Sequence, residues 1–230
     1  MTYRKDSDIV NRHPFGRLVE FKPHLSVIAA QSMASKQLFA KKKLVAWITS
    51  TCQTSVKREN FVRELQNYID VDVYGGCGSK QCGTINDCNE MMARDYKFVL
   101  SLEHTLCTDF ISEKMFWALE SGSVPVVYGK ANYQEFAPPH SYIDINEFSS
   151  PKALADHLIM LGSDSRMYHR YFEWKDNYKV ERYPTNGWCD LCEKLNDALY
   201  VSQSQFYEDI NEWWMGKATC ETSYPHLETL

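Results

Sequence analysis

Short apolar runs alternate with helical patterns through the middle of the chain. After the first run, apolar residues recur at helical spacing from Phe61 to Ile69. Strands that alternate with helices in this way predict an α/β fold with a Rossmann-like, doubly wound parallel sheet. Four runs have the length and the β-branched or aromatic content of buried strands, namely Leu44–Thr49, Val71–Tyr74, Phe98–Leu102 and Val124–Tyr128.

The flanking regions give weaker patterns. Residues 1–42 are poorly periodic and are interrupted by prolines and a glycine, so they predict a linker or the edge of another domain. Beyond the central unit, the pattern predicts a short strand over residues 142–145 and a helix over residues 150–161 with a proline at its first position. Further helices are expected over residues 89–95, 165–174, 188–200 and 205–215.

The segment between the last two strands carries clear helix signals. Asp109 or Ser112 can cap its first turn, and Gly122 lies where a left-handed residue ends a helix. Glu113 and Lys114 fall in that first turn. The free N–H groups of a helix start suit a phosphate, and open α/β sheets bind ligands beyond the carboxyl ends of their strands. Spacing alone nevertheless favours an ordinary solvated helix start.

Arg58 lies at the start of the predicted helix that follows the first strand. It therefore has the same position, one strand–helix unit earlier in the chain, that Lys114 has in the later unit. Two cations at neighbouring helix starts can clamp a diphosphate, although an exposed arginine explains the position equally well. Glu103, His104 and Asp109 also lie on the ligand side of the predicted sheet, which raises the hypothesis of a general base. An ordinary loop with common polar residues is the favoured interpretation there.

Asp70 and Asp72 form a D-x-D pair of the kind that holds a divalent metal in many sugar-nucleotide transferases. They stand at the start of a strand, at the end of the sheet opposite the ligand crevice. Alternation along a strand directs both side chains the same way, so a solvated face is the favoured interpretation. The sequence therefore predicts no metal site.

The composition gives conflicting indications of the compartment in which the chain acts. The chain has 230 residues and a net charge of -5, which argues against a general nucleic-acid surface. It has no apolar run long enough to span a membrane and no signal-peptide pattern at its start. Eight cysteines nevertheless suggest an oxidising compartment. One explanation of this conflict is that the chain is a piece of something longer.

Some of the cysteines lie just after predicted strands. Cys52 and Cys77 come after the carboxyl ends of two strands expected to be adjacent, so a disulfide between them is predicted. Cys82–Cys88 is a weaker second pair. A zinc site that also uses Cys189 and Cys192 is disfavoured, because the first three spacings are irregular.

Four stretches together resemble the α1,3/α1,4-fucosyltransferases, which move L-fucose from GDP-fucose to a glycan. The likeness covers nearly the whole chain, and VDVYGGCG with the extra cysteines is closest to members that fucosylate the core of N-glycans. The stretches are MTYRKDSDIV at 1–10, VDVYG at 71–75, DFISEKMFWALESGSVPVVYG at 109–129, and YFEW at 171–174 with CDLC at 189–192.

The resemblance implies the C-terminal lobe of a two-lobed GT-B glycosyltransferase, with GDP-fucose as donor and no metal or other cofactor. It implies that Arg58 and Lys114 hold the donor diphosphate and that Glu113 lies near the fucose and ribose hydroxyls. The acceptor is expected to be a GlcNAc hydroxyl of a glycoprotein N-glycan, in an inverting α1,3 transfer. The implied location is the Golgi membrane, on its lumenal side, reached through an N-terminal anchor outside this chain.

The same resemblance divides the chain into three parts. Residues 1–42 are expected to be a linker or remnant of the N-terminal lobe, residues 43–180 the nucleotide-sugar lobe, and residues 181–230 a terminal helical segment. The family's general base lies in the N-terminal lobe, so the chain by itself is expected not to transfer fucose. Cys189 and Cys192 would pair with that lobe, and are expected here to be free or paired with each other.

This chain departs from the family pattern beside the implied donor site. The family's F-E-N is Leu102-Glu103-His104, an aromatic residue is replaced by Val99, and a tyrosine is replaced by Phe110. These changes bear on donor affinity and choice, and they keep Glu103, His104, Val99 and Phe110 among the candidate donor-binding residues. Two alternatives stay open: a non-catalytic relative that binds sugar nucleotides or glycans, and an inactive fragment.

Overall fold

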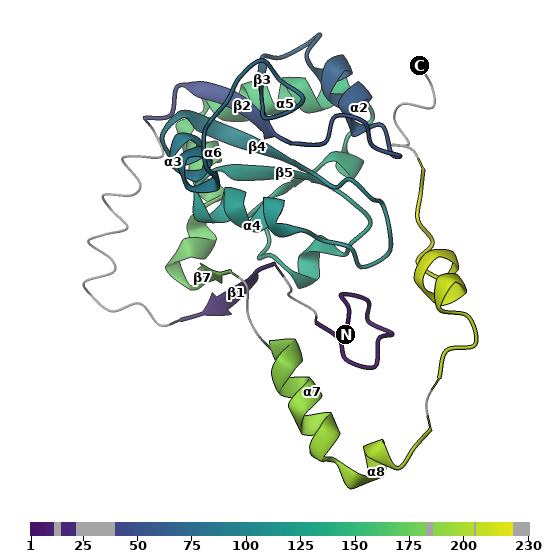
Figure 1. The fold of residues 1–230 in the computed structure, drawn as a ribbon. Coiled ribbons are helices and arrows are strands. Elements are labelled where there is room, and N and C mark those ends of the chain that lie inside the picture. Colours follow the sequence, from purple (N-terminus) through teal and green to yellow (C-terminus); the bar gives the residue numbers. More distant parts are fainter. Residues whose placement is uncertain (12–14, 22–39, 183–185, 205, 223–230) are drawn as a thin grey trace.

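A five-stranded parallel sheet lies at the centre of the computed structural model, which describes residues 1–11, 15–21, 40–182, 186–204 and 206–222 (Figure 1). The strand order is β3-β2-β4-β5-β6, which confirms the predicted doubly wound parallel sheet. The strands span Lys43–Ile48 (β2), Val71–Tyr74 (β3), Tyr96–Leu102 (β4), Val124–Tyr128 (β5) and Ile143–Asp144 (β6).

Helices cover both faces of this sheet. Along β4, Phe98, Leu100 and Leu102 join the apolar cluster beneath α2 and α5, while Val99 joins the cluster beneath α3 and α4. This alternation is the period of two that a strand imposes. The helices span Arg58–Leu65 (α2), Ile85–Asp95 (α3), Glu113–Glu120 (α4) and Pro151–Ser163 (α5).

The strand order changes direction at β2. The chain runs outward from β2 to β3 and then returns to β4 on the other side of β2. The connections that leave the carboxyl ends of β2 and β4 therefore diverge to opposite faces, α2 to one and α4 to the other. Such a switch point is where sheets of this type bind ligands.

Helix ends follow local signals. α3 begins four residues earlier than expected, because Thr84 and Asp87 form a capping box. Gly122 has φ 67°, which confirms the left-handed residue predicted after α4. The helix predicted over residues 165–174 is broken into α6 (Ser165–Arg170) and a 3₁₀ turn, η3 (Glu173–Asp176). The break places Phe172 in the cluster under α5 and Trp174 in the cluster under α4.

The helix predicted over residues 188–200 is also broken. It forms α7 (Asn186–Asn196) and α8 (Ala198–Val201), because the Asp197 side chain accepts hydrogen bonds from the Leu199 and Tyr200 N–H groups in the first turn of α8. The expected helix over residues 205–215 is reduced to a π-helical turn, η4 (Glu212–Gly216). Two more 3₁₀ turns, η1 (Tyr133–Glu135) and η2 (Ile145–Glu147), flank β6.

A second, two-stranded sheet was not predicted. β1 (Arg17–Glu20) pairs antiparallel with β7 (Tyr178–Glu181), with Leu18 opposite Val180. Leu18 and Val180 pack against the cluster that contains Phe116 of α4. Part of the range expected to be a linker thus covers one face of the unit built on the central sheet.

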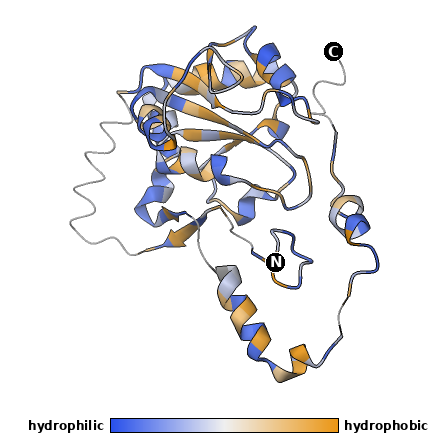
Figure 2. Cartoon of the chain, viewed as in Figure 1, coloured by the Kyte–Doolittle hydropathy of each residue, from blue (hydrophilic) through white to orange (hydrophobic). Residues whose placement is uncertain are grey.

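Apolar residues gather in the central strands, whereas α7 and α8 carry several on their outer surface (Figure 2). Trp188 and Leu199 are 63% and 77% exposed. Within the described ranges, no helix is both long and apolar enough to cross a membrane.

Candidate functional site

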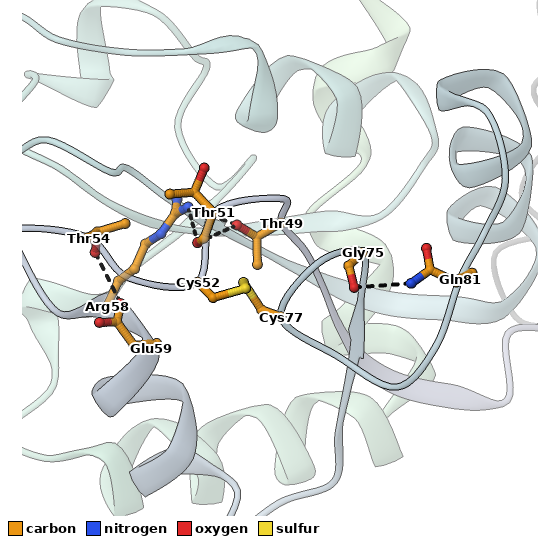
Figure 3. Close-up of a disulfide and its surroundings, with 9 residues drawn as sticks. All are labelled: Thr49, Thr51, Cys52, Thr54, Arg58, Glu59, Gly75, Cys77 and Gln81. Carbon is orange, nitrogen blue, oxygen red and sulfur yellow. Dashed lines mark hydrogen bonds between the residues drawn. A yellow bond between two sulfur atoms is a disulfide. The ribbon is translucent and has the colours of Figure 1, made fainter.

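Arg58 is fixed at the carboxyl ends of two strands. It is the first residue of α2 and only 2% exposed, so the predicted helix start is confirmed but the simple alternative of an exposed arginine is wrong. Its Nη1 donates to the carbonyl oxygen of Leu102 at 2.7 Å. Its Nη2 donates to the Thr49 hydroxyl at 2.8 Å, as Figure 3 shows. The guanidinium therefore ties the end of β2 to the end of β4.

Glu103 and Lys114 form an ion pair at the start of α4. Lys114 Nζ lies 3.2 Å from Glu103 Oε2 and 2.7 Å from the Ser112 hydroxyl. The Glu103 carboxylate is 1% exposed and also accepts hydrogen bonds from the Ser112 N–H and hydroxyl at 2.8 and 2.9 Å. An internal carboxylate therefore occupies the anion-binding position at this helix start.

The predicted side-chain caps of α4 are wrong. The Ser112 hydroxyl makes no capping bond, because it joins the contact between Glu103 and Lys114. Asp109 adopts a left-handed backbone with φ 65° and accepts a hydrogen bond from the Lys5 N–H at 3.2 Å. The Glu103 carboxylate takes the place of both predicted caps, Ser112 and Asp109, at the start of α4.

His104 is exposed beside this ion pair. Its ring meets Phe110 edge-on with centroids 5.3 Å apart, and Phe110 meets Tyr3 in the same way at 5.2 Å. Partial burial lowers the pKa of His104 from its ordinary value, and the charges of Lys114 and Arg58 act in the same direction. The imidazole is therefore predominantly neutral at pH 7.

The two other candidate residues, Glu113 and Val99, lie in different surroundings from each other. Glu113 is the first residue of α4 and half-buried, close enough for its charge to raise the pKa of His104. Val99 is buried in the middle of β4, among Met92 and Ala118. The structure therefore brings together Arg58, Glu103, His104, Phe110, Glu113 and Lys114, and leaves Val99 apart from them.

Both ends of the described chain contact the connection after β4, which the sequence did not indicate. Cys107 is bonded to Cys220, and the Thr108 N–H donates to the Ala218 carbonyl at 3.0 Å. From the other end, Tyr3 contacts Phe110, and the Arg4 guanidinium lies 4.5 Å from the Trp213 ring centroid. Cysteine content was the only available signal, because no strand or helix pattern indicated a partner for Cys107 or Cys220.

The other two disulfides were predicted. Cys52–Cys77 joins the connections after β2 and β3 (Figure 3), and Cys82–Cys88 closes a small loop before α3. Cys189 and Cys192 are exposed and free, as expected. The first disulfide restrains the loop that leads into Arg58.

The D-x-D pair lies at the opposite edge of the sheet. Asp70 is exposed, and the Asp72 carboxylate is paired with Lys80 and, at 3.3 Å, with Lys43. A hollow of about 880 Å³ is lined by both aspartates, Tyr68 and Tyr96. In the part of the chain that the structure describes, no three His, Cys, Asp or Glu side chains form a group that could hold a metal.

The chain is similar to known fucosyltransferases over most of its length. Residues 38–213 match the family described as glycosyltransferase family 10 (fucosyltransferase), C-terminal. The chain is 36% identical to alpha-(1,3)-fucosyltransferase C of Drosophila melanogaster, over 96% of this chain and 55% of that protein. It is 38% identical to glycoprotein 3-alpha-L-fucosyltransferase A of the same organism, over 96% of this chain and 44% of that protein.

The fold is similar to that of solved fucosyltransferases. A crystal structure of an α1,3-fucosyltransferase with GDP-fucose superposes with a TM-score of 0.59 at 17% identity, over 80% of this chain and 53% of that chain. The chain spans about half the length of the curated relatives it matches.

Proposed function

Because the chain belongs to glycosyltransferase family 10, the fucosyltransferases, we propose that its site at the ends of β2 and β4 binds the diphosphate of GDP-fucose. One observation carries the proposal: Lys114 lies at the start of α4, beyond the carboxyl end of β4. A helix start and an ammonium group both favour an anion there.

Each candidate residue has a role in this proposal. Lys114 contacts the diphosphate, and Arg58 holds the two strand ends that frame it while adding positive charge. Glu103 orients Lys114 and the Ser112 N–H, and Glu113 faces the sugar and ribose hydroxyls. Val99 and Phe110 adjust the shape of the site, Val99 through the packing of β4 and Phe110 through its ring contact with His104.

The proposed reaction is an inverting transfer of L-fucose to a GlcNAc hydroxyl of a glycoprotein glycan, in α1,3 linkage. The acceptor oxygen bonds to the anomeric carbon as the bond to the β-phosphate oxygen breaks, and the electron pair leaves with GDP. Positive charge at the diphosphate stabilises that leaving group. A carboxylate in a preceding lobe takes the proton of the acceptor hydroxyl, and the disulfides support action in the Golgi lumen.

A binding-only relative is the second candidate function. What favours it is that Glu103 already occupies Lys114 and the start of α4, so a donor phosphate must compete with an internal carboxylate. Donor affinity and fucose transfer must therefore be measured separately.

The test is GDP-fucose binding to Lys114→Ala, measured by calorimetry. Loss of a charge-assisted contact should weaken binding by about 1.5–3 kcal/mol, roughly ten- to 150-fold. Lys152→Ala is the matched control, because that lysine is exposed on α5 and paired with Asp156. Equal affinities for wild type and Lys114→Ala would contradict the proposal. A transfer assay with an N-glycan acceptor, carried out on this chain joined to an N-terminal lobe of the family, then separates the enzyme from the binding-only relative.

A further inference from the structure

His104 lies among four charged side chains contributed by three elements. His104 directly follows Glu103 in the chain, and Glu103 Oε2 accepts a hydrogen bond from Lys114 Nζ at 3.2 Å. Arg58 of α2 donates to the carbonyl of Leu102, two positions before His104. Lys114 and Glu113 come from the first turn of α4, and all four charges act on the imidazole.

These four charges balance before any ligand arrives. Arg58 and Lys114 supply two positive charges, and Glu103 and Glu113 supply two negative charges. The two phosphates of a nucleotide sugar add two further negative charges. A diphosphate bound here therefore leaves the local charge strongly negative unless another positive charge appears.

Three cations of the surrounding segments are paired with carboxylates. Lys5 lies 2.8 Å from Glu135 and 3.7 Å from Asp109, and Lys130 lies 2.9 Å from Glu221. Arg4 is paired with Asp6. Because each of these charges is offset locally, the imidazole is the group at this site whose charge can change near neutral pH.

We propose that His104 takes up a proton when a nucleoside diphosphate sugar binds, so that the imidazolium supplies the compensating positive charge and a hydrogen bond to the diphosphate. The inference rests on the proposed function of the site. It goes further by making donor affinity dependent on pH through one named residue.

The environment of the free site sets the direction of the effect. Partial burial, Lys114 and Arg58 lower the pKa of His104, and Glu103 and Glu113 oppose them only in part. A bound diphosphate removes the net repulsion and raises the pKa of the same group. Between the two pKa values the complex binds one more proton than the free protein, so donor affinity rises as pH falls.

The experiment measures GDP-fucose binding to the wild-type chain from pH 8 to pH 6 by calorimetry, in two buffers with different ionisation enthalpies. GDP-fucose is used because each of its two phosphates is linked on both sides, so neither changes its charge in this pH range. The terminal phosphate of GDP, in contrast, titrates at a pKa of about 6. We expect the affinity to rise about tenfold over this range, with net proton uptake from the buffer.

His104→Asn tests the residue itself, because asparagine keeps a hydrogen-bond donor but cannot take up a proton. Its donor affinity should be independent of pH, and its proton uptake should vanish. His140→Asn is the matched control: His140 is exposed with φ 60°, a conformation that asparagine tolerates, and it should retain both effects.

Two failures are distinguishable. If wild type binds GDP-fucose with no pH dependence and no proton uptake, or if His104→Asn keeps both, the His104 inference is wrong while the donor site stands. If wild type binds no GDP-fucose at any pH, the proposed function itself fails.

Discussion

Cys107 and Cys220 form a disulfide that fixes the last part of the described chain to the connection after β4. The backbone strengthens this contact, because the Glu221 N–H donates to the Leu106 carbonyl at 2.9 Å. The Lys130 ammonium, just after β5, pairs with the Glu221 carboxylate at 2.9 Å. Residues 217–221 therefore restrain two of the connections at the carboxyl edge of the sheet.

Removing this disulfide should lower stability. The bonded cysteines are 113 positions apart, and bridges of this kind typically contribute about 2–4 kcal/mol to the free energy of unfolding. Cys107→Ala with Cys220→Ser should show that loss in urea unfolding, together with faster hydrogen exchange at the Thr108 and Glu221 amides. Cys189→Ser with Cys192→Ser is the control, since both cysteines are free and exposed. An unchanged unfolding midpoint in the first variant would contradict this account.

Gly129 should not tolerate a side chain. A Cβ there would lie 2.5 Å from the Tyr133 hydroxyl and 3.1 Å from Glu103 Cγ, so Gly129→Ala should cost about 1–3 kcal/mol of unfolding free energy. Tyr133→Phe removes the nearer obstacle, so adding Gly129→Ala to it should cost less. Urea unfolding of the four proteins forms a double-mutant cycle. Additive losses would show that the hydroxyl is not the obstacle.

Stability should rise with pH because of Lys41, which is only 4% exposed. Its Nζ donates to the Gly122 carbonyl at 2.6 Å and the Ser123 hydroxyl at 3.0 Å. Burial, assisted by the charge of Lys175, lowers the pKa of Lys41 from 10.5 to about 7. Between these values the unfolded chain binds the extra proton, so the contribution of Lys41 to the free energy of unfolding should increase from pH 7 to pH 9, by at most ~1.4 kcal/mol per pH unit.

Lys41→Met should reduce the slope of unfolding free energy against pH, because methionine fills similar space without a titrating group. Lys42→Met is the matched control, since the neighbouring lysine is exposed. Chemical denaturation at pH 7, 8 and 9 measures the slope. If the slope in Lys41→Met equals that of wild type, the ammonium is charged in the folded state and this prediction is wrong.

Asp72 should add a second pH dependence of the same sign, in the acid range. Burial alone would raise the pKa of its carboxyl, but hydrogen bonds from Lys80, Tyr96 and Lys43 outweigh burial and hold it below the ordinary value of 3.8. The stabilisation is therefore complete above about pH 5 and is lost as pH falls below 3.8. Asp72→Asn should cost about 1 kcal/mol of unfolding free energy at pH 7 and less at pH 3.

Asp70→Asn provides the comparison for that experiment. Asp70 is exposed on the same edge, so its substitution should leave stability unchanged at both pH values. Thermal unfolding of both variants at pH 7 and pH 3 is sufficient. A loss in Asp72→Asn that is equal at the two pH values would exclude charge as its cause.

The sequence predicted elements whose signals are local. β3 and β5 begin and end at the predicted residues, because each is a β-branched run bounded by turn residues. β1 and β7 are short strands far apart in the chain, and each is stabilised only by the other and by the cluster around Phe116. No local pattern marks such strands, so their pairing could not be read from the sequence.

The candidate site shows the same limit. The predicted parallel sheet placed Arg58 and Lys114 at the starts of helices that follow neighbouring strands, since parallel strands end at one edge of the sheet. Sequence could not show that Arg58 is buried against the Leu102 carbonyl or that Glu103 replaces a side-chain cap, because both depend on tertiary contacts. Val99 was included by resemblance alone, and its place within the core follows from strand alternation.

The pairing of β1 with β7 has a consequence for synthesis on the ribosome. Residues 17–20 leave the exit tunnel about 160 residues before their partner strand, which at ordinary elongation rates means a wait of roughly 8–30 s. All five strands of the central sheet lie between residues 43 and 144, so they emerge within that interval. We expect the nascent chain to assemble its central sheet first, with Phe116 uncovered and within reach of chaperones until β7 arrives.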